Sequence, residues 1–209
     1  MSRTITRLFD NFADAERAVA ELERMGVPHR DISLIAGNAD KSHDHRGPYD
    51  DGRTPGDHAA RDAGKGAATG GAIGGVGGLL AGLGLLAIPG LGPVVAAGWL
   101  ASTLVGAGVG AAAGGAAGGL IGALKHAGES DENAQVYAEG VRRGGTLVSA
   151  KVDDSQAAKV ESALIGFHAV DAATRGAAYR QSGWSRFDDT APVYTVEQIE
   201  VERSRYTAP

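Results

Sequence analysis

Hydrophobic and polar positions follow two different periods in the first part of the chain. Residues 4–9 mix β-branched and apolar side chains with polar ones, which is typical of a half-buried strand. Apolar residues then recur at spacings of three and four from Phe12 to Leu22, which predicts a helix with one buried face. Residues 31–36 have the pattern of a second strand. Residues 1–37 are therefore expected to form strand, helix and strand.

The same order returns over residues 131–175. A helical pattern ends at Gly144, and an alternating strand pattern covers residues 146–152. A second helix follows, and residues 169–172 suggest a short last strand. Two such halves predict an α+β protein with a ferredoxin-like βαββαβ domain. The long insertion between them is tolerable because loop entropy grows slowly with length.

Glycines dominate the segment between the two halves. No charged residue occurs from Gly66 to Leu124. Glycine at every fourth place lets two helix backbones approach closely. We therefore expect a glycine-zipper helical hairpin over residues 66–125 that splits the domain, with residues 38–65 as a flexible linker. The expected helix-packing residues are Gly66, Gly70, Gly74, Gly78, Gly82, Gly106, Gly110, Gly114, Gly118 and Gly122, and the expected hairpin turn consists of Pro89, Gly90, Gly92 and Pro93.

Such helices need support from outside themselves. Each interior glycine costs a helix about 1 kcal/mol relative to alanine. A helix over residues 66–88 would be about 34 Å long, enough for a bilayer core of about 30 Å. Membrane insertion or association is the favoured interpretation, and a soluble oligomeric zipper is the second. A disordered spacer fits poorly with the regular spacing and the interleaved leucines. In either favoured case we expect self-association through the hairpin.

Residues 176–209 form a polar tail that contains several aromatic residues, and we expect it to be mostly irregular. Thr195 and Gln198 have the spacing of a capping box, which predicts a short helix over residues 195–205. The aromatic residues of the tail fit two interpretations. The tail docks on its own domain, or it binds a partner.

Composition excludes several classes of protein. The net charge of −5 argues against general nucleic-acid binding, which needs a basic face. The absence of cysteine excludes disulfide and thiolate chemistry. The first residues lack the apolar core of a secretory signal, so we expect a cytoplasmic N-terminus, with the chain at a membrane or in the cytoplasm.

Candidate catalytic, cofactor and metal sites are weak. Residues 82–87 match the G-x-G-x-x-A dinucleotide pattern, but no predicted strand precedes them. Residues 43–45, His-Asp-His, have metal-binding side chains in a stretch that nothing orients, so we interpret them as solvated linker. We assign no catalytic, cofactor-binding or metal residue and expect a non-enzymatic protein. The alternative is a soluble binding module whose sheet recognises a ligand or a protein.

Two stretches carry a family likeness. Residues 7–10, 13–19 and 31–35 resemble the start of bacterial general stress proteins of the heat-induced YflT type. Residues 137–145 are similar to the later half of longer members that have a glycine-zipper insert. The resemblance implies a bacterial stress-response protein, so the expected membrane is the bacterial inner membrane, and it supplies no catalytic residue. The long glycine segment and the aromatic tail depart from the shortest members.

Overall fold

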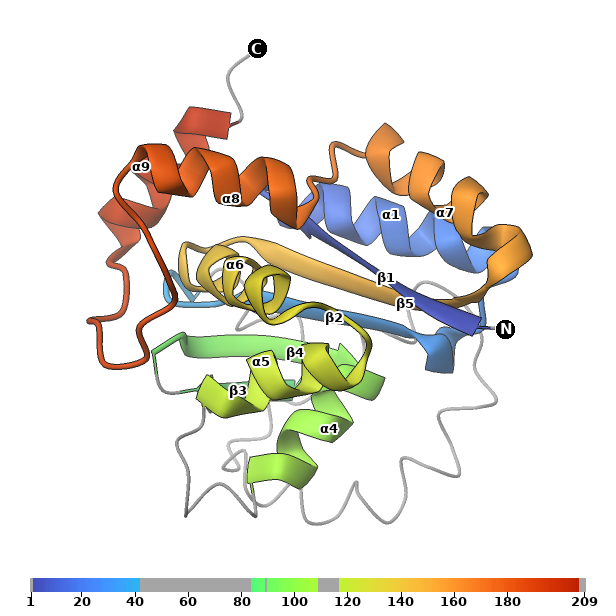
Figure 1. Ribbon diagram of the computed structural model, residues 1–209, viewed down its shortest axis with the longest axis horizontal. Helices are drawn as coiled ribbons and strands as arrows, with labels where there is room; N and C mark the ends of the chain where they lie inside the picture. Colours follow the sequence, from blue (N-terminus) through green and yellow to red (C-terminus); the bar gives the residue numbers. More distant parts are fainter. Residues whose placement is uncertain (1, 42–83, 89, 109–116, 207–209) are drawn as a thin grey trace.

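A single antiparallel sheet organises the protein. The computed structural model describes residues 2–41, 84–88, 90–108 and 117–206 (Figure 1). The strands lie in the order β1-β5-β2-β4-β3, and each neighbouring pair is antiparallel. The mixed α+β class expected from the sequence is confirmed. The strands are β1 (Ser2–Phe9), β2 (Ile32–Gly37), β3 (Gly84–Ile88), β4 (Gly92–Gly98) and β5 (Thr146–Asp153).

Helices cover both faces of this sheet and produce two apolar cores. One face packs against α1 (Phe12–Arg24) and α7 (Asp154–Gly166), which lie side by side in Figure 1. The other face packs against a second layer of helices and the start of the tail. The helices of that second layer are α4 (Trp99–Gly108), α5 (Ala117–His126), α6 (Asp131–Arg142) and α8 (Ala172–Gln181).

Strand β5 occupies the middle of the sheet although it comes late in the chain. It pairs with β1 through Ile5 opposite Ala150 and with β2 through Leu34 opposite Val148. Its buried side chains serve both cores, since Leu147 belongs to the α6 side and Val148 to the α1 side. The early and late parts of the chain are therefore interleaved in one sheet.

Residues 84–98 form strands where the sequence analysis predicts helix. The predicted helical hairpin is wrong here, because the chain forms two strands, and β4 pairs with the edge of β2. The chain does reverse between them. Leu91 N–H donates to Ile88 O at 3.0 Å, and Gly90 has a φ of +76°. This turn joins strands rather than helices, and Pro93 lies in β4.

The physical reason is that short apolar runs do not reveal their period. Buried helix and buried strand have the same composition over five to eight residues. As a strand, β4 gives the edge of β2 a hydrogen-bonding partner and buries Val94 in one core and Val95 in the other. The glycines of this stretch also avoid their cost in a helix.

The later part of the glycine segment is helical. Gly106 lies in α4, and Gly118 and Gly122 lie in α5. A Cβ atom added to Gly122 would have no described atom within 4 Å. No helix of the described ranges is long and apolar enough to cross a bilayer. The other expected packing and turn residues lie outside the described residues: Gly66, Gly70, Gly74, Gly78, Gly82, Gly110, Gly114 and Pro89.

The C-terminal region is more ordered than the sequence analysis expected. Val170 makes a single antiparallel bridge to Leu8, and Asp171 begins α8, a helix that was not predicted. The last helix, α9 (Val196–Tyr206), was predicted. Its capping box is present, because Gln198 N–H donates to Thr195 Oγ1 at 3.3 Å and Thr195 N–H donates to Gln198 Oε1 at 2.9 Å.

Candidate functional site: an arginine cluster beneath the C-terminal helix

Helix α6 ends in two consecutive arginines that are buried. Arg142 is 8% exposed and Arg143 is 7% exposed. Both donate to Glu139, Arg143 from Nε at 2.7 Å and Arg142 from Nη2 at 2.9 Å. Residues three and four apart lie on one face of a helix, so a single carboxylate serves both guanidinium groups. Glu139 itself is fully buried.

A second carboxylate reaches the cluster from α9. Arg143 Nη1 donates to Glu202 Oε1 at 2.9 Å, and Arg205 Nη1 donates to Glu202 Oε2 at 3.0 Å. One turn earlier on α9, the buried Ile199 lies against Gly144, where an added Cβ would come within 2.5 Å of Ile199 Cγ2. Gly144 therefore leaves the space in which α9 packs.

A third buried arginine comes from α8. Arg175 is 3% exposed and donates from Nη2 to Asp10 Oδ2 at 2.6 Å. Its guanidinium lies 3.6 Å from the centre of the Tyr206 ring at the end of α9. The buried Tyr179 ring lies between the arginines, 4.1 Å from Arg143 and 5.9 Å from Arg175. Cation–π contacts of this kind gain strength when water is excluded.

Burial and charge act on the ionisable groups in opposite directions. Burial lowers the pKa of Arg143, but its hydrogen bonds to Glu139 and Glu202 and their charges raise that pKa above its ordinary value overall. Burial raises the pKa of Asp10, and the nearby Arg175 only partly offsets this. Burial likewise raises the pKa of Tyr179 well above its usual range, so it stays a neutral phenol. The cluster is thus a network of charged arginines whose counter-ions come from α6, from α9 and from Asp10, which follows β1.

The tail closes over Arg142. Its guanidinium lies 5.6 Å from the centre of the Phe187 ring and 5.3 Å from that of Tyr194. Arg142 Nε is buried and has no hydrogen-bond partner among the described residues. Aromatic residues of the tail therefore dock on the domain, as one of the two interpretations of the sequence expected.

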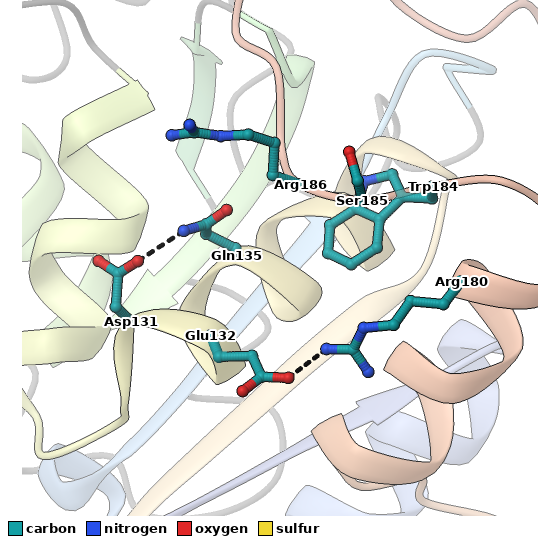
Figure 2. Close-up of a pocket in the computed structure, with 7 residues that line it drawn as sticks. All are labelled: Asp131, Glu132, Gln135, Arg180, Trp184, Ser185 and Arg186. Atoms are coloured by element: carbon teal, nitrogen blue, oxygen red, sulfur yellow. Dashed lines mark hydrogen bonds and ion pairs between the residues drawn. The ribbon is translucent and has the colours of Figure 1, made fainter.

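The opposite end of α6 borders a surface hollow (Figure 2). Asp131 accepts hydrogen bonds from Lys125 Nζ at 2.7 Å and from Gln135 Nε2 at 2.5 Å, and Glu132 forms an ion pair with Arg180. The carboxylates of the hollow are thus paired within the chain. No dashed contact joins Arg186 to the other residues drawn in Figure 2. The residues that line the hollow are Asp131, Glu132, Gln135, Arg180, Trp184, Ser185 and Arg186.

The candidate metal-binding and dinucleotide-binding residues of the sequence analysis do not form a site among the described residues. Residues 43–45 lie outside the described residues, and residues 84–87 of the dinucleotide-like pattern belong to β3 rather than to a loop before a helix. The arginine cluster was not predicted. The spacing of Glu139, Arg142 and Arg143 was a visible signal for it, but their burial depends on a helix about 60 residues later in the chain.

Comparison with protein-family models, with curated proteins and with solved structures finds no match for the chain. The resemblance to bacterial general stress proteins therefore stays a prediction.

Proposed function

We propose that this is a non-enzymatic bacterial stress-response protein that acts by self-association through its charge-free segment. The observation that carries the proposal is the edge strand β3. It ends the sheet among the described residues, contains no charged side chain, and exposes 43% of Leu85. Soluble proteins usually protect such edges with charges, prolines or bulges. Residues 84–88 contain none of these charges or prolines.

The hydrogen bonds of β4 show which backbone N–H and C=O groups of β3 point out of the sheet. Asn38 N–H donates to Pro93 O at 2.8 Å, so the backbone groups of Pro93 point toward β2. Ala87 is the partner of Pro93 in the β3–β4 register. Opposite residues whose polar groups point away from each other form a non-hydrogen-bonded pair, so the N–H and C=O of Ala87 point out of the sheet. The same holds for Leu85, two residues earlier.

A second copy of the chain is the occupant that we propose for this edge. Two β3 strands related by a two-fold axis pair antiparallel, so that one surface patch serves both copies. Identical charged edges would repel each other, and this edge has no charge. The stress-response part of the proposal is supported by the resemblance of residues 7–10 and 137–145.

The fold proposed for this function is a ferredoxin-like domain extended by the β3–β4 hairpin. Leu8 N–H donates to Val170 O at 2.9 Å, and Val170 N–H donates to Leu8 O at 2.8 Å. Both bonds leave from the side of Leu8 that faces away from β5, so Val170 borders the outer edge of β1. The resulting order of Val170, β1, β5 and β2 supports this proposal, since it is the strand order of a βαββαβ sandwich.

The test compares two substitutions at one edge position. Ala87→Pro removes the outward N–H, and proline is tolerated in edge strands on the side that faces solvent. Ala87→Val retains this N–H. We expect the wild type and Ala87→Val to associate with rising concentration in sedimentation velocity, and Ala87→Pro to remain monomeric. A monomeric wild type, or equal association of all three proteins, would contradict the proposal.

Membrane association is the second candidate, and the exposed Leu85 in a charge-free segment favours it. Flotation of the same three proteins with phosphatidylcholine vesicles separates the two candidates. Binding to vesicles that is unaffected by Ala87→Pro would favour an apolar surface contact over strand pairing.

A further inference from the structure

We infer that the arginine cluster is a docking site for a helix, and that α9 of a second copy can fill it in place of the chain's own α9. This contact between copies would involve α9 and the arginine cluster, whereas the self-association proposed above involves β3. In the structure, the site is filled by the α9 of the same chain, which shows what kind of helix fits.

Charge is the first argument. Without α9, the buried part of the cluster has three arginines and only two carboxylates, Glu139 and Asp10. Glu202 supplies the third carboxylate. A helix that covers the site buries Arg143, and a buried charge without its partner is strongly destabilising. The site therefore favours a helix whose carboxylate reaches Arg143.

Shape is the second argument. Gly144 accommodates Ile199, and Arg143 binds Glu202 three residues further along the same helix face. Arg203 adds an outer contact, since it donates from Nη1 to Asp40 Oδ2 at 2.8 Å and from Nη2 to Gly144 O at 3.1 Å. The site thus selects a helix that presents isoleucine and glutamate three residues apart. Every copy of this chain carries such a helix.

The attachment of α9 is the third argument. The residues between the buried Phe187 and α9 are mostly exposed, and this stretch of eight residues spans up to about 27 Å when extended. An isolated helix of eleven residues is marginal in water. Docking therefore stabilises α9 as a helix, and docking on either copy satisfies the same groups. Exchange of an identical element between copies is a low-cost route to a dimer.

The test is complementation between two full-length variants. The first carries Arg143→Gln, so its site is weakened while its α9 is intact. The second carries Ile199→Ala and Glu202→Gln, so its α9 is weakened while its site is intact. Both also carry Ala87→Pro, so that failure of the β3 proposal and failure of this inference are distinguishable. Each variant alone should be monomeric in native mass spectrometry, and an equimolar mixture should give a one-to-one heterodimer.

A matched control carries Ala87→Pro together with Glu200→Gln and Val201→Ala, on the exposed side of α9. This control should gain no heterodimer when it is mixed with the Arg143→Gln variant. Gly144→Ala is a second way to block the site, and it should behave as Arg143→Gln does. A mixture that stays monomeric would overturn the inference. So would loss of the folded state in the Ile199→Ala/Glu202→Gln variant, detected by circular dichroism, because α9 would then be an indispensable part of its own domain.

Discussion

Gly98, at the junction of β4 and α4, shows how one residue can set the distance between two strands. Its φ is +84°, and an added Cβ would lie 2.2 Å from Ile32 O and 2.8 Å from the Cα of Ser33. Gly26, after α1, has a similar φ of +89°, but an added Cβ there would meet no atom within 4 Å. Both positions therefore impose backbone strain on any other residue, but only Gly98 is also crowded by neighbouring atoms.

Alanine at each position should give different losses of stability. Gly26→Ala should lower the free energy of unfolding by about 1–2 kcal/mol, the cost of a left-handed conformation for an L-residue. Gly98→Ala should lower it by clearly more, because the new methyl also collides with backbone that cannot move without disturbing β2. Urea unfolding of both variants measures this. Equal losses would mean that the junction relaxes freely.

The sequence shows in which segment glycines are frequent. It does not show which individual glycines are tightly packed in the folded protein. Gly98 is not among the glycines that recur at every fourth place, and Gly122 is. The atoms around Gly98 are nevertheless closer than those around Gly122. The regular spacing reflects composition along the chain. The close approach arises only when the fold brings β2, about 60 residues earlier in the chain, beside β4.

At the scale of elements, α8 depends on Asp171, the residue that caps its N-terminus. Asp171 Oδ1 accepts a hydrogen bond from Thr174 N at 2.7 Å, and Asp171 Oδ2 accepts one from Thr174 Oγ1 at 3.2 Å. The backbone hydrogen bond from Thr174 is the main reason that the pKa of Asp171 lies below its usual value. The carboxylate form is thus favoured in the folded protein.

Asp171→Ala should lower the free energy of unfolding by about 1 kcal/mol at neutral pH, as loss of a helix cap does. The folded pKa of Asp171 is below the unfolded pKa, so its charge contributes stability above the unfolded pKa, and this contribution is lost as the pH falls through the folded pKa. Asp171→Asn caps the helix without titrating. Urea unfolding over the acid range should show a smaller pH dependence for Asp171→Asn than for the wild type. Parallel pH profiles for the two proteins would contradict this.

Periodicity predicted β1, α1, β2, α6, β5 and α7, whose apolar and β-branched residues follow the order strand, helix, strand in each half of the chain. It failed for β3 and β4, whose short apolar runs have no period of their own and take their conformation from the edge of β2. It also missed α8, although Asp171 and Thr174 have the spacing of an N-cap and its partner.

At the scale of the whole molecule, two cores share one sheet. Leu22 is fully buried in the core beneath α1 and α7. Trp99 and Trp184 both pack against the other core. Tryptophan fluorescence can therefore show whether a substitution in the α1/α7 core also affects the core on the opposite face of the sheet.

Leu22→Ala should lower the free energy of unfolding by about 2–5 kcal/mol, the usual cost of such a core cavity. Because β5 contributes to both cores, we expect tryptophan fluorescence and far-ultraviolet circular dichroism to shift to the same lower urea midpoint. Fluorescence that keeps the wild-type midpoint while circular dichroism shifts would show that the two layers unfold separately.

The arginine cluster also belongs to this scale, which is why the sequence did not predict it. Its groups come from α6, α8, α9 and Asp10, the residue that follows β1. Only the folded chain brings them together. The pairing of Glu139 with Arg143 is local and could be predicted. The burial of that pair depends on the tail, whose docking was only one of two interpretations.

The central position of β5 has a consequence for synthesis of the protein. Among the described strands, β1 is the first to be translated, and its described neighbours in the sheet are β5 and Val170. Both neighbours are translated well over a hundred residues later. At ordinary elongation rates, β1 waits on the order of ten seconds without a partner. The backbone groups along the edges of β1 therefore stay unpaired for that time in each newly made chain, which is long enough for a chaperone to bind them.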